Sequence, residues 1–335
     1  MLFLQVACAQ GKFAHLESSI EARKKELGVD LMVIIANKDT ILYEKAFGDV
    51  TNRAQATVGA ASAWFTTALV LQLVDEGKIS LDDEVSRYLP IYDSYFKSFL
   101  TIRHCLTQMT GIQMDPFKTT DLTAKRKYES LEEEANDYAK KEIQTNAGEE
   151  FRFNGIGFSI AARVAEIATK KKFEQLMRQR IFTPLGMRNT SFSTDYGSPA
   201  SAFSQAKSTA ADFTKFLQML LNNGKLNGKQ ILSEAAVAEM KKIQVPREKM
   251  KFSPKAAGDF QYTLGTWAIE GGEGAGKHAT ALTSPGLLGV WPMVDFSRGY
   301  TFLIFPKNVT VEQNANVFLG LKQEIDQLNL LPSKK

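Results

Sequence analysis

The sequence predicts an α/β protein of the α+β type, with an antiparallel sheet built from both chain ends and flanked by helices. Residues rich in aromatic and β-branched types, which favour strands, occur at 30–36 and 40–47 and return at 262–269, 287–294 and 300–305. Between these groups, residues 131–221 follow mostly helical patterns. The two ends therefore form one sheet, with a mostly helical domain inserted between them.

The N-terminal part predicts a helix followed by a hairpin. Residues 13–27 have an amphipathic helical pattern that ends at Gly28, and Asn37-Lys38-Asp39 separates the first two strand-like runs. Asn and Asp between two such runs indicate a tight turn.

A central helix is predicted within residues 57–83. Its residues 65–74 are apolar nearly all round, which predicts a buried helix, and Gly77 is placed where a helix commonly ends. The small residues Gly59 and Ala60 stand at its start. Unpaired backbone N–H groups at a helix start carry a partial positive charge, so this is a place where an oxyanion could be held.

The remaining elements are mainly helical. A short helix is predicted in residues 100–111, and longer ones at 156–169, 173–179 and 210–221, with a closing helix at 311–328. No repeat or linker divides the chain. We interpret 10–335 as one domain, with a sheet region at about 10–60 and 255–335 and a helical region at about 61–254.

Composition excludes several classes of function. The chain has 335 residues, a net charge of +4 and a pI of 8.8, which is too mild for a nucleic-acid-binding protein. Two cysteines indicate no disulfide framework, and no spacing of His, Cys, Asp or Glu indicates a metal site. We predict no cofactor and no transmembrane segment.

The first residues, MLFLQVACAQ, are apolar and offer Ala7-Cys8-Ala9 as a cleavage site. Residues 1–9 are interpreted as the remnant of an export signal, which indicates a periplasmic or secreted protein. The stretch is short and lacks a basic start, so an ordinary apolar N-terminal segment is the alternative.

Several long motifs, in order, resemble the serine β-lactamase-like and penicillin-binding-protein-like hydrolases. Residues 73–90, LVDEGKISLDDEVSRYLP, are similar to the segment that follows the family's S-x-x-K motif. Further similar segments are found at 100–111, 148–154, 181–192 and 208–212. The resemblance implies a β-lactamase/transpeptidase-like fold with the active site between the sheet and the helical region.

The residues that perform the family's chemistry are replaced. Aligned on those motifs, the family serine falls on Ala60, the lysine on Ala63 and the tyrosine on Phe153. In the family the serine attacks a carbonyl, the lysine helps to deprotonate it, and the tyrosine passes a proton to the leaving group. Each replacement removes the reactive group while the surrounding motifs remain. Laboratory inactivation and a natural pseudoenzyme both explain this pattern.

The resemblance also implies a set of substrate-binding residues. Thr283-Ser284-Pro285-Gly286 falls where the family has its third motif, on a strand lining the site, so Ser284, Gly286 and Leu287 are candidates. Trp64, next to Ala63, is a candidate pocket wall, and Gln108 departs from the family motif at a position near the site. Ser62 is about 200° round the helix from Ala60 and should face away.

Three hypotheses follow. The first is a family scaffold whose chemistry has been removed, and which with its reactive groups restored would transfer acyl groups from an ester, a β-lactam or a peptide. The second is a binding module for acyl or peptidoglycan-like ligands that does not cleave them. The third is a working hydrolase with another nucleophile. All three imply a small acyl ligand and no nucleic acid.

A glycine-rich segment, GGEGAGKH at residues 271–278, nearly matches a phosphate-binding loop. Its last position is His278 in place of the Ser or Thr that binds magnesium, and the residues after it do not predict a helix. We therefore interpret it as a flexible loop between strands.

Overall fold

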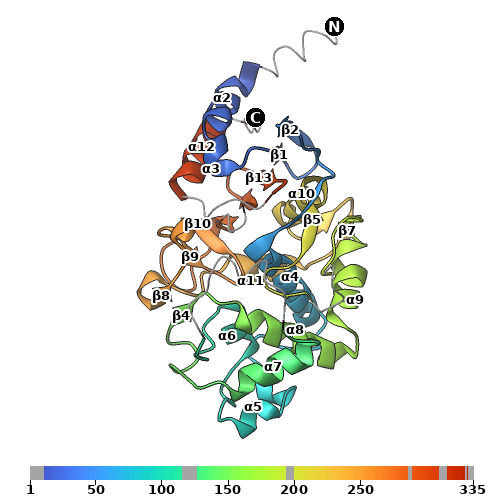
Figure 1. The fold of residues 1–335 in the computed structure, drawn as a ribbon, viewed down its shortest axis with the longest axis vertical. Coiled ribbons are helices and arrows are strands. Elements are labelled where there is room, and N and C mark those ends of the chain that lie inside the picture. The colour runs from blue at the N-terminus through green and yellow to red at the C-terminus, as the bar shows by residue number, and fades with distance from the viewer. Residues whose placement is uncertain are drawn as a thin grey trace.

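The computed structural model describes residues 11–114, 127–193, 200–285, 289–308, 315–328 and 330. Its centre is a seven-stranded antiparallel sheet with the order β2-β1-β13-β12-β11-β10-β9 (Figure 1). The strands are β1 (Leu31–Ala36), β2 (Ile41–Phe47), β9 (Gln261–Tyr262), β10 (Trp267–Gly271), β11 (Ala279–Thr283), β12 (Trp291–Asp295) and β13 (Tyr300–Pro306). Because β1 pairs with β13, the predicted sheet from both chain ends is confirmed.

The N-terminal hairpin forms as its sequence predicts. Every residue of β1 is buried, and its register with β13 runs from Leu31 opposite Pro306 to Ala36 opposite Thr301. The Asn37 side chain closes the turn by accepting hydrogen bonds from the backbone N–H groups of Asp39 (2.8 Å) and Thr40 (2.7 Å). This is the side-chain to backbone bond by which Asn stabilises tight turns.

Helices cover the sheet and fill the middle of the chain. They are α2 (Ala14–Ala22), α3 (Lys24–Leu27), α4 (Ser62–Asp75), α5 (Ile91–Ser94), α6 (Ile102–Leu106), α7 (Leu131–Lys140), α8 (Ile156–Thr169), α9 (Phe173–Met177), α10 (Ala210–Leu221), α11 (Glu234–Lys241) and α12 (Ala315–Gln327). Helices α2 and α12 lie side by side at one end of the molecule, and α5, α6, α7 and α8 lie at the other (Figure 1).

Three further pairs of strands lie outside the seven-stranded sheet. They are β3 (Gln55–Thr57) with β5 (Lys207–Thr209), β4 (Phe151–Arg152) with β8 (Met250–Phe252), and β6 (Lys225–Leu226) with β7 (Lys229–Gln230). Strand β3 precedes α4 and pairs with β5, and strand β4 precedes α8 and pairs with β8. Both pairs connect segments that are far apart in the sequence.

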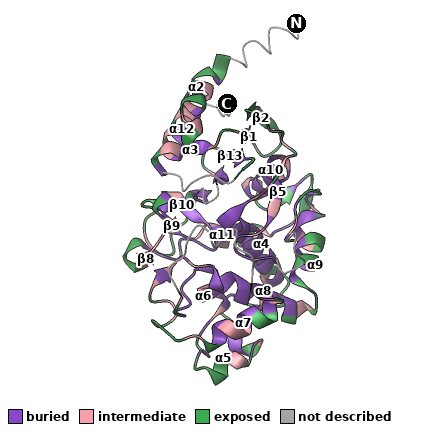
Figure 2. Ribbon diagram, viewed as in Figure 1, coloured by how far each residue is buried: buried purple, intermediate pink, exposed green. Residues whose placement is uncertain are grey.

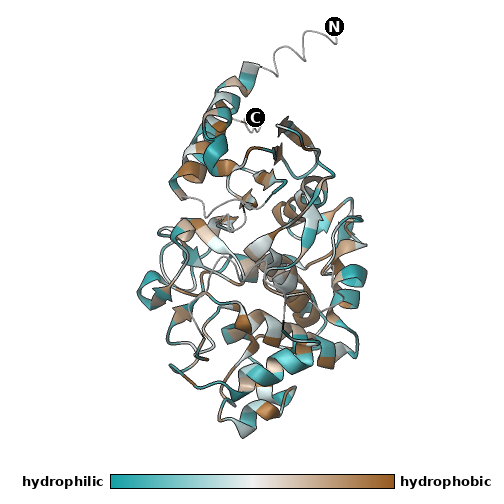
Figure 3. Ribbon diagram, in the orientation of Figure 1, coloured by the Kyte–Doolittle hydropathy of each residue, from teal (hydrophilic) through white to brown (hydrophobic). Residues whose placement is uncertain are grey.

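Helix α4 is the buried centre of the helical region, as its apolar pattern predicts. Figure 2 colours it as buried, and Figure 3 contrasts it with the outer, largely hydrophilic α7. The Phe65 ring meets those of Phe182, Phe213 and Phe216 at centroid distances of 5.4, 5.0 and 4.8 Å. Gly77 follows with φ 67°, and the Lys78 N–H donates to Leu73 O at 3.0 Å. This is the glycine-terminated helix end that the sequence predicts.

Two predicted elements are interrupted. The helix over 13–27 breaks at Arg23, whose backbone has φ −106° and whose side chain bonds Ser19 O, so α2 and α3 are separate. The strand over 262–269 is divided by a turn in which Thr263 N donates to Thr266 O (2.9 Å) and Gly265 has φ 70°. An L residue rarely adopts that φ, so glycine allows the chain to turn there.

Other boundaries also differ from the pattern. The predicted strand 287–294 begins at Trp291, and the short helix within 100–111 ends at Leu106. Helix α9 ends at Met177 and continues as a π-helix, Arg178–Phe182. The start of the predicted helix 311–328 lies partly outside the described residues. The strand pattern does not predict β11, which has two alanines, no aromatic residue and only threonine as a β-branched type.

Helix α12 is fixed to the sheet by a buried ionic cluster. The Lys322 ammonium, 3% exposed, lies 2.7 Å from Glu270, 3.1 Å from Asp295 and 2.8 Å from Asp326. Burial alone lowers the pKa of Lys322, but its bonds to Asp326 and Glu270 outweigh that effect and raise the pKa above its ordinary value. The negative charge of Glu270 is thus balanced by the ammonium group of Lys322.

No described helix is long and apolar enough to cross a membrane.

Candidate active site

The site that the sequence predicts begins at the start of α4. Residues Gly59–Ala61 form a single 3₁₀ turn that leads into the helix, and the side chains of Ala60 and Ala63 are 4% and 1% exposed. The Ser62 hydroxyl donates to Gly59 O (2.7 Å) and accepts from Ala206 N (3.0 Å). Ser62 therefore holds this turn against the chain near residue 206, and both hydrogen bonds engage its oxygen.

Phe153 lies among other aromatic rings. It is 1% exposed, and its ring centroid is 5.1 Å from that of Phe203 and 6.1 Å from that of Trp267. The residue before Phe203, Ala202, accepts a 2.6 Å hydrogen bond from Thr66 of α4. Phe153 and α4 therefore contact the same segment of chain.

The end of β11, which leads into Ser284, is connected to Phe153 through the neighbouring strand β10. Trp267, whose ring contacts Phe153, is paired with Thr283, and Ser284 follows directly. The turn before β10 lies against α4: a Cβ added at Gly265 would clash with the Thr67 hydroxyl and would be 3.2 Å from Ala63 O. Ala63, Phe153 and the Ser284 strand are therefore linked through the turn and strand that contain Gly265 and Trp267.

The candidate substrate-binding residues differ in their hydrogen bonding, and two of them are not described by the structure. Ser284 is 3% exposed, and its N–H faces Pro292 O at 3.4 Å. Trp64 is fully buried, and its indole N–H finds no hydrogen-bond partner among the described residues. Gly286 and Leu287 lie outside the described residues. The described part of the site is therefore lined by buried, mostly apolar side chains.

Gln108 joins three segments beside Phe153. Its side chain carbonyl accepts from Asn154 N (2.9 Å) and Gly155 N (3.0 Å), and its amide donates to the Tyr262 hydroxyl (2.8 Å). The residue is 2% exposed and has φ 56°, a region that non-glycine residues rarely occupy. The described contacts make Gln108 a residue that positions the backbone around Phe153.

We expect Gln108→Ala to destabilise the protein by about 2–4 kcal/mol, because it leaves the half-buried N–H of Asn154 and the buried N–H of Gly155 without their acceptor. Tyr262→Phe removes only one hydroxyl and should cost about 1 kcal/mol. Urea unfolding of both variants measures the difference. Equal losses for the two substitutions would contradict this role of Gln108.

Three aromatic residues beside Phe153 and Gln108 are not predicted from the sequence as part of the site. They are Phe203, Tyr262 and Trp267. Tyr262 and Trp267 fall in a predicted strand, but nothing in the pattern indicates which face they occupy, and no pattern in the sequence indicates Phe203.

Burial raises the pKa of the Tyr262 hydroxyl and of the Cys105 thiol, so both stay protonated at neutral pH. Among the described residues, no group of three His, Cys, Asp or Glu side chains could hold a metal.

The glycine-rich segment is a loop between β10 and β11, as the sequence interpretation predicts. The N–H groups of Gly272, Gly274 and Gly276 donate to His278 O, the Gln261 side chain and Ile243 O. Since these donors already have protein acceptors and no helix follows, the loop is not built to hold a phosphate.

Comparison with known proteins gives a family match over most of the chain. A family model described as Beta-lactamase matches residues 14–304. Among individual proteins, "Protein flp" of Staphylococcus aureus is 24% identical over 178 residues, which cover 50% of this chain and 35% of that protein. The chain therefore matches only about a third of the length of this relative.

Solved structures agree over nearly the whole chain. A putative beta-lactamase from Bacteroides dorei has a TM-score of 0.82 at 25% identity, and covers 95% of this chain and 99% of its own. EstCE1, described as a hydrolase with promiscuous acyltransferase activity, has a TM-score of 0.78 at 17% identity, with coverage of 95% and 99%. The sheet flanked by helices is thus the fold of these proteins, as the sequence predicts.

Proposed function

The chain belongs to the beta-lactamase family, and we propose that it keeps the frame of that family's acyl-transferring hydrolases but transfers no acyl group. With the reactive groups restored, the substrate would be an ester, a β-lactam or a peptide amide. The proposal holds whether the three replacements are natural or engineered.

One observation carries the proposal. The side chains at the positions aligned with the family serine, lysine and tyrosine are two methyl groups and one phenyl ring, each at most 4% exposed. A methyl group has no lone pair to attack a carbonyl, and a phenyl ring has no proton to pass to a leaving group. Backbone N–H groups alone cannot form an acyl-enzyme.

Three side chains in α4 and α6 that carry a hydroxyl or a thiol are poor substitutes for the nucleophile. The Ser62 hydroxyl is engaged by two hydrogen bonds, and the Thr67 hydroxyl lies against Gly265 with no room for a substrate. Cys105 is fully buried, and burial raises its pKa, which disfavours the reactive thiolate. None of these three groups is therefore placed to act as the nucleophile.

The test is to treat the intact protein with excess p-nitrophenyl acetate or benzylpenicillin and measure its mass. We expect no mass increase on the folded protein beyond that of a denatured sample, whose exposed lysines react nonspecifically. One acyl group added stoichiometrically to the native protein alone would overturn the proposal and favour another nucleophile.

A binding module for acyl or peptidoglycan-like ligands at the same place is less well supported. Such a ligand needs polar groups that fix its orientation, whereas the side chains of Ala60, Ala63 and Phe153 offer none. Nothing in the described residues favours this second function at this site.

A further inference from the structure

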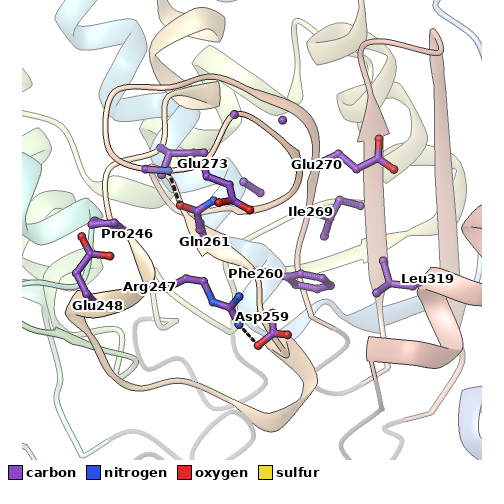
Figure 4. Close-up of a pocket in the computed structure, with 15 residues that line it drawn as sticks. Pro246, Arg247, Glu248, Asp259, Phe260, Gln261, Ile269, Glu270, Glu273 and Leu319 are labelled. Carbon is purple, nitrogen blue, oxygen red and sulfur yellow. Dashed lines mark hydrogen bonds and ion pairs between the residues drawn. The ribbon is translucent and has the colours of Figure 1, made fainter.

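A cavity of about 600 Å³ lies away from the candidate active site, at the edge of the sheet. Its walls come from the chain after α11, from β9 and β10, from the glycine loop and from α12 (Figure 4). None of Ala60, Ala63, Trp64, Gln108, Phe153 or Ser284 contributes to it. Its volume is that of pockets that hold small organic molecules.

One side of the cavity is apolar. Figure 4 shows Phe260, Ile269 and Leu319 together on the right of the view. The Phe260 ring, 6% exposed, is held edge-on against Trp291 at a centroid distance of 6.5 Å, so its position is fixed. This side presents a rigid aromatic and aliphatic surface on which a ring or a short alkyl chain could lie.

The polar side of the cavity carries an excess of negative charge. Arg247 is paired with Asp259, and Glu270 is compensated by Arg298 and Lys322. In the described part of the chain, Glu248 and Glu273 form no ion pair, and both line the cavity with exposed carboxylates. Figure 4 places Glu248 across the cavity from Phe260.

We infer that this cavity binds an organic cation with an apolar body, such as a protonated arylalkylamine. The ring lies on the surface formed by Phe260, Ile269 and Leu319, and the ammonium group faces the uncompensated carboxylates of Glu248 and Glu273. A cation near the Phe260 ring is also attracted by the negative face of the ring. An anion is disfavoured, because the nearby Arg247 is already paired and the glycine-loop N–H groups have acceptors. The inference does not depend on whether the active site transfers acyl groups.

The test is titration calorimetry of the full chain with phenethylamine at low ionic strength. Phenylacetate, which has the same ring with the opposite charge, is the ligand control. We expect saturable binding of phenethylamine, none of phenylacetate, and weaker binding in 0.5 M salt, because added salt screens exposed charges.

The double variant Glu248→Gln with Glu273→Gln keeps the shape of both side chains and removes their charges. It should lower the affinity for phenethylamine by about fivefold or more, since each charge attracts the cation across a partly screened distance. Glu129→Gln, an exposed glutamate outside the cavity, is the matched control and should leave the affinity unchanged. Absence of phenethylamine binding, equal binding of phenylacetate, or equal affinities of the double variant and the control would each overturn the inference.

Discussion

The triple variant Ala60→Ser, Ala63→Lys, Phe153→Tyr should hydrolyse p-nitrophenyl butyrate at least about 10³-fold faster than the unaltered chain, because it returns a nucleophile, a base and a proton carrier. Positions 60 and 63 lie one turn apart at the start of α4, so their side chains share a face. Burial at position 63, now 1% exposed, lowers the pKa of an introduced ammonium and favours the neutral amine that acts as a base.

The control is the double variant Ala63→Lys, Phe153→Tyr, which carries every change except the nucleophile. It should stay at the background rate, since a base without a nucleophile forms no acyl-enzyme. Circular dichroism and urea unfolding establish that both variants are folded. A folded triple variant with no activity above the double variant would contradict the roles assigned to these positions.

Phe65→Ala should lower the free energy of unfolding by about 3–5 kcal/mol, the usual cost of removing a fully buried phenyl ring. Phe65 fixes α4 through its contacts with Phe182, Phe213 and Phe216, and the vacated space is enclosed by rings that cannot easily collapse into it. Urea unfolding monitored by tryptophan fluorescence measures the loss.

Phe96→Ala makes the same chemical change at a ring that is 82% exposed. Its unfolding free energy should change by less than about 0.5 kcal/mol, because little apolar surface is uncovered. A similar loss in both variants would mean that α4 is not the centre of the core.

The sequence predicts most of the helical frame, because local signals set it. The bounds predicted for α8 and α10 match the structure. Gly155 precedes α8 with φ 80°, and the Thr209 side chain caps α10 by accepting from Asp212 N (3.1 Å). Capping residues and apolar periodicity are both readable from neighbouring positions, so these elements need no knowledge of the rest of the fold.

The features that the sequence does not predict depend on distant contacts. The break of the strand at 263–266 is made where Gly265 meets α4, and Gln108 finds its partners about 46 and 154 positions away. The cavity exists only because segments after α11, in β10 and in α12 meet. Periodicity reports only on neighbouring residues and does not predict contacts between distant segments. The positions of Ala60, Ala63 and Phe153 in the site are indicated by motif resemblance alone.

Locating the acyl group on the triple variant tests the role assigned to position 60 most directly. The variant is treated briefly with p-nitrophenyl acetate, stopped in acid, digested and mapped by mass spectrometry. We predict one acyl group, on the peptide that contains position 60, and none on the Ala63→Lys, Phe153→Tyr control. An acyl group on any other residue, or on both proteins alike, would contradict the claim that this site keeps the backbone arrangement of a serine acyl-transferring enzyme.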